Sequence, residues 1–120
     1  MSDKAQIEKT LQAYRDCMFE SSAAKTLEAF HANAKVTGYM GDALAEISVG
    51  DFAGLVESAQ PSAKEKGETP LFEVLSIEIA GKTAVARVRD EFQGTTFLDT
   101  LSLINEGEKW SIYNKLFHIE

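Results

Sequence analysis

TAVARVRDEFQGTTFLDTLSLI, residues 83–104, decides the fold, because it reads as two alternating segments joined by a tight turn. Apolar and polar side chains alternate on both sides of Gln93-Gly94, which is typical of strands with one buried face. A residue pair that ends in Gly favours a two-residue hairpin turn. Such a turn fixes the pairing, so Val88 is expected opposite Asp99. The stretch predicts an antiparallel hairpin.

Two further alternating segments extend this hairpin into a meander. Residues 71–80 precede it across Gly81-Lys82, and residues 109–119 follow it across a loop at 105–108. Four strands joined by short turns form a continuous antiparallel sheet. The C-terminal half of the protein is therefore predicted to be all β.

The N-terminal half shows mainly helical spacing. Ser2 is a good N-cap, and Ile7, Leu11, Tyr14 and Met18 recur at steps of four, three and four, which places them on one face of a helix ending near residue 19. The remaining predicted elements are a short second helix with Leu27 and Phe30 buried, strands at 34–40 and 43–48, a helix at 51–58 with Phe52, Leu55 and Val56 facing inward, and a loop at 58–70. Helices that cover one face of an antiparallel sheet are α+β organisation, here in one domain, residues 1–120.

Composition excludes several classes of function. Nineteen acidic against twelve basic residues give a net charge of -7, which argues against nucleic acid and anionic membrane surfaces as partners, since both require a basic patch. Cys17 is the only cysteine, so no disulfide within the chain is expected. The charged N-terminus lacks the apolar core of a signal peptide, which favours a cytoplasmic protein. No phosphate-binding loop, nucleophile elbow or zinc motif occurs, so no cofactor is expected.

Asp99 is the sharpest candidate for a functional residue. With a four-residue loop at 105–108, it is expected opposite Asn114, in the middle of an otherwise apolar inner face. A charged carboxylate in a dry core is costly unless it is paired or hydrogen-bonded. One interpretation is that Asp99 and Asn114 anchor a ligand in a pocket, or that Asp99 is a general acid or base. The other is a structural pair that fixes the strand register.

Three further residues are candidate ligand contacts. Tyr14 lies on the inner face of the first helix, where its hydroxyl can reach Asp99 or another partner. His118 is expected on the inner face near the open end of the last strand. Trp110, expected opposite Leu103, is more typical of a core than of a ligand site. His31 and His118 are far apart and lack acidic neighbours at ligand spacing, so no metal site is expected.

The opposite face of the sheet carries a mixture of apolar and polar side chains that solvent alone does not explain. Such a patch indicates self-association. The predicted homodimer interface consists of Arg87, Leu98, Ile104, Tyr113 and Phe117.

Three stretches of the sequence resemble a known superfamily. AFHANAKVTGY (29–39), VLSIEIAGKTAVARVR (74–89) and FLDTLSLINEGEKWSIYNKLFH (97–118) resemble the nuclear transport factor 2-like (NTF2-like) superfamily, and most closely its small bacterial proteins catalogued as putative lumazine-binding. The resemblance implies a cone-shaped, cystatin-like fold in which a strongly bent antiparallel sheet wraps around the N-terminal helices. It also implies a pocket in the concave face and a homodimer packed through the convex face. Relatives include ketosteroid isomerases and SnoaL-like polyketide cyclases.

Three hypotheses about function follow. The first is a binding protein for a small apolar or aromatic molecule. The second is an isomerase, cyclase or dehydratase with Asp99 as general acid or base. In the isomerases a Tyr hydroxyl and a protonated Asp form the oxyanion hole; here a second carboxylate at a matching position is not evident, since Asp90 lies near a strand end. The third is a module that binds another protein.

Overall fold

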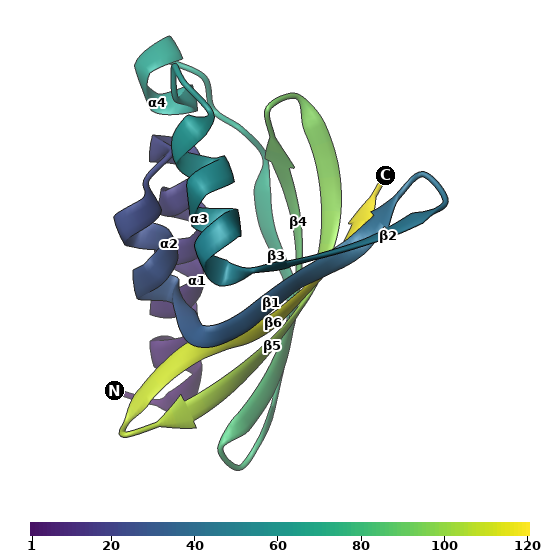
Figure 1. Ribbon diagram of the computed structural model, residues 1–120. Helices are drawn as coiled ribbons and strands as arrows, with labels where there is room; N and C mark the ends of the chain where they lie inside the picture. Colours follow the sequence, from purple (N-terminus) through teal and green to yellow (C-terminus); the bar gives the residue numbers. More distant parts are fainter.

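Helices lie against one face of a strongly bent sheet (Figure 1). The computed structural model describes residues 1–120. The helices are α1 (Asp3–Glu20), α2 (Ala23–Ala29), α3 (Val49–Ser58) and α4 (Ala63–Lys66). The strands are β1 (Phe30–Met40), β2 (Ala43–Ser48), β3 (Phe72–Ala80), β4 (Thr83–Phe92), β5 (Thr95–Glu106) and β6 (Lys109–Ile119). The predicted α+β class and its cone-shaped arrangement are confirmed.

The sheet is mixed rather than wholly antiparallel as predicted. Its order is β2-β1-β6-β5-β4-β3, and β1 pairs with β6 in parallel while all other neighbouring strands are antiparallel. The first and last strands therefore meet inside the sheet. This arrangement brings the C-terminal strand β6 under the helical layer.

Helix α1 forms as its spacing predicts. The Ser2 hydroxyl accepts a hydrogen bond from the Ala5 amide at 3.1 Å, which satisfies one of the free amides of the first turn. The predicted apolar positions are all buried against the sheet. The helix ends at Ser21, which adopts a left-handed conformation (φ 50°) and donates its hydroxyl proton to the Ala59 carbonyl at 2.7 Å. This bond ties the end of α1 to the segment that follows α3.

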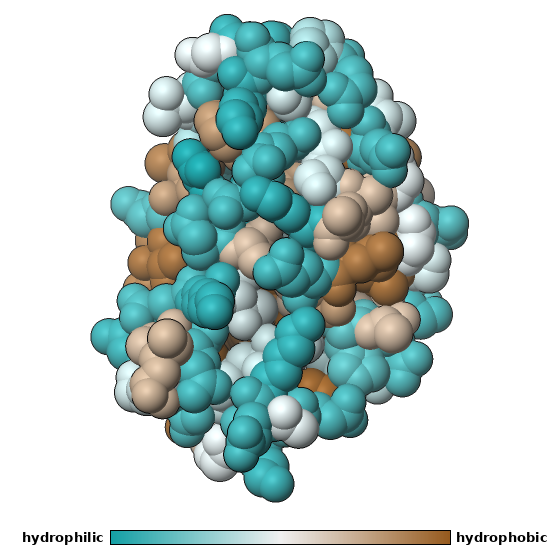
Figure 2. All heavy atoms as spheres, turned by 90° about the vertical axis from the view of Figure 1, so that its left-hand side faces the viewer, coloured by the Kyte–Doolittle hydropathy of each residue, from teal (hydrophilic) through white to brown (hydrophobic).

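Two residues predicted to be buried in the shorter helices are exposed. Leu27 of α2 is 53% exposed and Leu55 of α3 is 59% exposed, whereas Thr26 and Ala53 take the buried positions. A helix of seven residues makes two turns, so an error of one position in its start rotates the buried face by about 100°. Figure 2 shows that this helical side of the molecule is mostly hydrophilic, with separate hydrophobic patches.

The hairpin between β4 and β5 has the predicted register. Val88 pairs with Asp99, and Phe92 pairs with Thr95 across the turn. Gln93 (φ 51°) and Gly94 (φ 78°) both have positive φ, as a two-residue turn matched to the strand twist requires. The pairing places Asp99 on the inner face.

The hairpin between β5 and β6 differs from the prediction in two ways. The turn has two residues, Gly107 (φ 59°) and Glu108 (φ 66°), rather than four, so Glu106 pairs with Lys109. A bulge at Tyr113 then inserts one extra residue into β6. The shorter turn shifts the pairing of β6 with β5 by two residues, so the β6 side chains between the turn and the bulge stay on their predicted faces. The bulge shifts the pairing by one further residue, so the β6 side chains after Tyr113 lie on the face opposite to the predicted one.

Candidate functional site

Four polar side chains meet in the interior, one from each of α1, β4, β5 and β6. Tyr14, Asp90 and Asp99 are completely buried, and Lys115 is 6% exposed. The helix brings Tyr14 over the sheet, while adjacent positions on β4 and β5 bring the two carboxyls side by side. We call these four residues the interior cluster.

The Tyr14 hydroxyl links the two carboxyls. Its oxygen lies 2.6 Å from Oδ2 of Asp99 and 3.2 Å from Oδ2 of Asp90. A phenol has one proton, so it donates along the shorter contact, to Asp99. The second oxygen of each carboxyl, Oδ1, is buried and has no hydrogen-bond partner within the protein. Each of these oxygens can accept a further hydrogen bond.

Lys115 supplies the positive charge of the cluster. Its Nζ lies 4.0 Å from Oδ2 of Asp99. The ammonium also lies over three aromatic rings, at 4.6 Å from the centroid of Phe52, 5.1 Å from that of Tyr14 and 5.9 Å from that of Phe97. Attraction to the faces of aromatic rings partly replaces the water that a buried ammonium loses.

The environment changes the protonation of Asp90. Burial first, and then the hydrogen bond and the charge of Asp99, raise the pKa of Asp90 from 3.8 to about 9. Asp90 therefore holds a proton at neutral pH, and the ammonium of Lys115 lies beside Asp99. One shared proton and one ammonium make the cluster neutral, which lowers the cost of burying it.

The phenol of Tyr14 is also held in its protonated form. Burial, followed by the charges of Asp99 and Asp90, raises the pKa of Tyr14 well above its usual 10.0. The cluster thus combines a neutral carboxylic acid, a neutral phenol, a carboxylate and an ammonium. This set can donate hydrogen bonds, accept them and transfer a proton.

A cavity of about 330 Å³ opens beside the interior cluster, at the end of the molecule where α1 ends, α4 lies and β4 turns into β5 (upper end of Figure 1). This volume is at the lower end of the roughly 300–1,000 Å³ of small-molecule sites. Its lining residues include Arg15, Met18, Phe19, Phe72, Glu91 and Phe92. We call it the upper cavity.

Phe72 contacts both the upper cavity and the interior cluster. Its side chain lines the cavity. It pairs with Asp90 across β3 and β4, and its ring packs edge-on against Tyr14 with centroids 6.0 Å apart. Phe72 therefore links the cavity to the residues that hold the buried acids.

The structure brings together only part of the predicted site. Tyr14 and Asp99 are in direct contact, as the sequence allowed. Asn114 is exposed on the outer face opposite Ser102, and His118 is exposed there opposite Leu98, so neither is near Asp99. Both were misplaced because the bulge at Tyr113 reverses the faces of the strand beyond it.

Trp110 is a structural residue beneath α1. It is 2% exposed, its Nε1 donates to Asp3 at 3.3 Å, and its carbonyl accepts from the Thr10 hydroxyl at 2.9 Å. It borders a larger hollow of about 760 Å³ at the opposite end of the molecule from the upper cavity. The prediction that Trp110 is more typical of a core than of a ligand site agrees with these contacts.

The sequence interpretation missed Lys115 and undervalued Asp90. Without the bulge at Tyr113, Lys115 would fall on the outer face, away from Asp99. A signal for Asp90 was present, because in the correctly predicted hairpin register it follows Val88 by two positions and so lies diagonally opposite Asp99. Its place near the end of β4 hid this relation.

Comparisons with known proteins agree with this fold. The model of a family described as putative lumazine-binding matches residues 2–118. An NTF2-like protein of unknown function from Methylobacillus flagellatus KT is 29% identical, with a TM-score of 0.87 over 98% of this chain and 92% of that one. One from Silicibacter pomeroyi DSS-3 is 22% identical, with a TM-score of 0.88 over 100% of both chains. A search among curated proteins found no match.

A more distant structure carries the name of an enzyme class. A ketosteroid isomerase-like protein from Erwinia carotovora atroseptica SCRI1043 superimposes with a TM-score of 0.72 at 13% identity, over 99% of this chain and 98% of that one. At this level of identity the similarity concerns the fold alone. The family match spans nearly the whole sequence, and the chain therefore belongs to the putative lumazine-binding family of NTF2-like proteins.

Proposed function

We propose that the protein binds a small aromatic or apolar molecule in the upper cavity. The observation that carries the proposal is a cavity of about 330 Å³ that is lined by Phe19, Phe72 and Phe92 and in which the Phe72 ring also packs against Tyr14 of the interior cluster. Aromatic walls with a few polar groups are typical of sites for small molecules. The description of the family as lumazine-binding is consistent with a planar aromatic ligand.

The proposed site is the upper cavity, whereas the sequence predicted a site around Asp99 and Asn114. Phe19, Phe72 and Phe92 come from α1, β3 and β4, so the cavity is assembled from segments far apart in the sequence. In this arrangement Asp90 and Asp99 lie behind the ligand site rather than in it. Their unpartnered oxygens are buried in this structure.

Filling the cavity is a direct test. Ala63 lines it from the start of α4, so Ala63→Trp should occupy the ligand volume. Ala80→Trp, on an exposed position of β3, is the matched control. We expect saturation-transfer NMR with a set of aromatic fragments to show binding to the wild type and to Ala63→Trp at no more than a tenth of the wild-type affinity, with the control unchanged. Equal binding by Ala63→Trp would exclude the upper cavity as the site.

Acid–base catalysis is the second candidate function, and the protonated Asp90 favours it. A carboxylic acid that is neutral at pH 7 beside a phenol can stabilise an oxyanion or deliver a proton. A catalytic role requires substrate to contact the cluster past Phe72. Turnover of a bound ligand that is lost in Asp99→Asn, with affinity retained, would support this function over binding alone.

A homodimer through the convex face remains part of the proposal, with a changed set of residues. Phe117 and Lys115 point inward, whereas Leu116 is 53% exposed on the convex face, between Thr37 of β1 and Thr100 of β5. Leu98 and Ile104 keep their predicted face. We expect Leu116→Asp to give a monomer in sedimentation velocity, because Phe117, predicted at the interface, points inward; an unchanged dimer would exclude this face.

A further inference from the structure

We propose that the upper cavity selects an aromatic ligand that carries an anionic group, and that Arg15 binds this group. The inference rests on the proposed function, because it assigns a ligand class to the same cavity. It follows from the position of Arg15, from the partners of the other charged residues at the cavity, and from the aromatic walls.

Arg15 is placed to present its guanidinium group to the cavity. Arg15 and Phe19 are four residues apart on α1 and both line the cavity, and the guanidinium carbon lies 4.3 Å from the centroid of the Phe19 ring. Stacking on a ring face leaves the edge of a guanidinium group free for hydrogen bonds. A carboxylate in the cavity can therefore meet Arg15 edge-on beside an aromatic wall.

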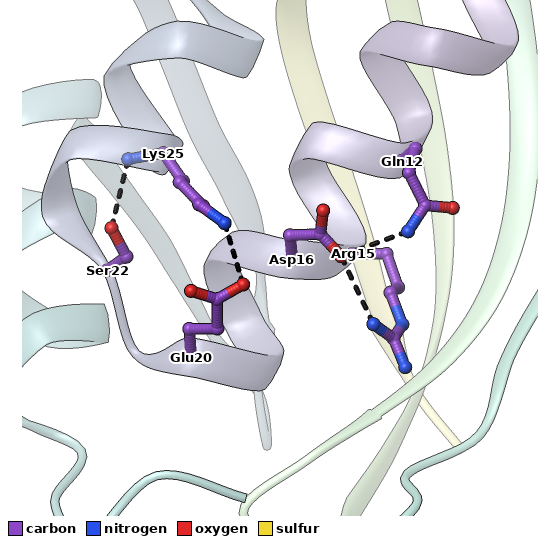
Figure 3. A network of polar contacts seen from close by, with 6 residues as sticks. All are labelled: Gln12, Arg15, Asp16, Glu20, Ser22 and Lys25. Atoms are coloured by element: carbon purple, nitrogen blue, oxygen red, sulfur yellow. Dashed lines mark hydrogen bonds and ion pairs between the residues drawn. The ribbon is translucent and has the colours of Figure 1, made fainter. Parts of the chain in front are cut away.

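Most of the hydrogen-bonding capacity of Arg15 is unused. Its one acidic partner is Asp16, whose Oδ1 lies 3.1 Å from one terminal nitrogen and also accepts from Gln12 at 2.9 Å (Figure 3). A guanidinium group has five N–H donors, arranged to form two parallel bonds with a carboxylate. Asp16 does not line the cavity, so its bond leaves the cavity side of Arg15 available.

The other charged side chains at the cavity have partners within the protein. Glu68 pairs with Lys66 at 3.3 Å, and Oε1 of Glu91 accepts from the Leu71 amide at 3.4 Å. Lys66 and Glu68 offset each other, and Arg15 is the cation at the cavity whose ion-pair partner, Asp16, does not line it. Together with three phenylalanine rings, this favours a planar anion over a neutral or cationic molecule of the same size.

The negative net charge of the protein does not attract an anionic ligand. A charge of -7 repels an anion at long range, and this repulsion is screened beyond about 10 Å at 0.1 M salt. Affinity for an anion must therefore come from the residues that touch it. Removal of a positive charge elsewhere on the surface should have little effect.

The test compares two probes with the same ring system, 2-naphthoate and the neutral 2-naphthylmethanol, by isothermal titration calorimetry at 0.1 M salt. We expect the wild type to bind 2-naphthoate at least tenfold more tightly, and Arg15→Gln to lose this preference while binding the alcohol as before. Lys25→Gln is the matched control: Lys25 lies on α2, pairs with Glu20 at 2.7 Å (Figure 3) and does not line the cavity. It should keep the preference.

The outcomes separate this inference from the function on which it rests. If neither probe binds the wild type, the cavity is not a site for aromatic molecules and both proposals are wrong. If both probes bind equally, or if Arg15→Gln keeps the preference for the anion, the ligand class is wrong and the proposed function stands. Arg15→Lys keeps the charge but loses the two-pronged geometry and the stacking, so it should retain only part of the preference.

Discussion

The interior cluster and the upper cavity hold their charges in opposite ways, although Phe72 contacts both. In the cluster, two carboxyls, a phenol and an ammonium are buried, and they neutralise one another by sharing a proton. At the cavity the charged side chains lie near solvent, where Lys66 pairs with Glu68 and Arg15 pairs with Asp16. A charge buried away from water is costly unless an opposite charge or a hydrogen bond lies beside it. A charge near solvent does not carry this cost, so it can contribute to the affinity for a charged ligand.

This difference predicts where substitutions affect stability and where they affect binding. Changes in the cluster should lower the free energy of unfolding and alter its pH dependence. Changes at the cavity should leave stability almost unchanged and alter ligand affinity. Phe72, which contacts both regions, should affect both.

Removal of the buried cation should have the largest effect. Lys115→Met leaves Asp90 and Asp99 without a counter-charge, and we expect a loss of about 3 kcal/mol in the free energy of unfolding, which lowers Tm by on the order of 10 °C. Lys82→Met, at the exposed turn between β3 and β4, is the control. Thermal unfolding followed by circular dichroism measures both, and a Lys115→Met variant as stable as the control would show that the cluster is not balanced by this lysine.

Phe72→Ala should combine a moderate loss of stability with a change in pH dependence. The half-buried ring contributes about 2 kcal/mol. Its removal admits water to Tyr14 and Asp90, which lowers the pKa of Asp90 toward its usual range because burial is the main cause of the increase. The decrease in Tm between pH 5 and pH 9 should therefore be smaller than in the wild type.

Phe92→Ala, which enlarges the same cavity without removing a ring that contacts Tyr14, is the comparison for Phe72→Ala. It should keep the wild-type pH dependence. If Phe72→Ala keeps it too, Phe72 does not separate the cavity from the cluster.

Asp90→Asn should produce a smaller effect whose sign depends on pH. Because the pKa of Asp90 rises from 3.8 to about 9 on folding, the folded protein binds more protons than the unfolded chain between these values. Its contribution to stability is complete below about pH 4 and declines as the pH rises toward 9. Asparagine imitates the protonated acid and does not titrate, so the variant should gain stability relative to the wild type as pH rises.

Thermal unfolding from pH 5 to pH 9 measures this trend, with Asp42→Asn at the exposed turn between β1 and β2 as control. A constant difference between Asp90→Asn and the wild type over this range would mean that Asp90 does not take up a proton on folding.

Arg15→Gln should have the smallest effect on stability. Its side chain is 31% exposed and its ion pair with Asp16 lies near the surface, so the expected change is within about 0.5 kcal/mol. The same substitution is expected to change the affinity for an aromatic anion tenfold. A large loss of stability instead would place Arg15 in the fold rather than at a binding site.

The two hairpins of the meander show how far sequence alone specifies this structure. Between β4 and β5 the turn Gln93-Gly94 is short and unambiguous, so the register, the inner face and the position of Asp99 could all be predicted. Between β5 and β6, Gly107 can belong to a turn of two or of four residues, and local sequence does not distinguish the two.

The bulge at Tyr113 could not be predicted, because the residues beyond it alternate plausibly in either phase. Leu116 can face inward as well as Phe117, and a lysine is seldom placed in a core. The choice is made by tertiary contacts: Lys115 finds Asp99 and three aromatic rings only in the observed phase. The upper cavity was not foreseen for a related reason, since its walls come from segments that approach one another only in the folded chain.

The measurement that most directly tests the central claim is a titration of the isotope-labelled protein with 2-naphthylmethanol, followed by amide chemical shifts. This probe is uncharged, so it reports on the cavity independently of Arg15. We expect saturable shifts concentrated at residues lining the upper cavity, such as Thr69, Glu91 and Gly94. The absence of saturable shifts, or shifts centred on Asp3, Lys109 and Trp110 at the opposite end, would contradict the account.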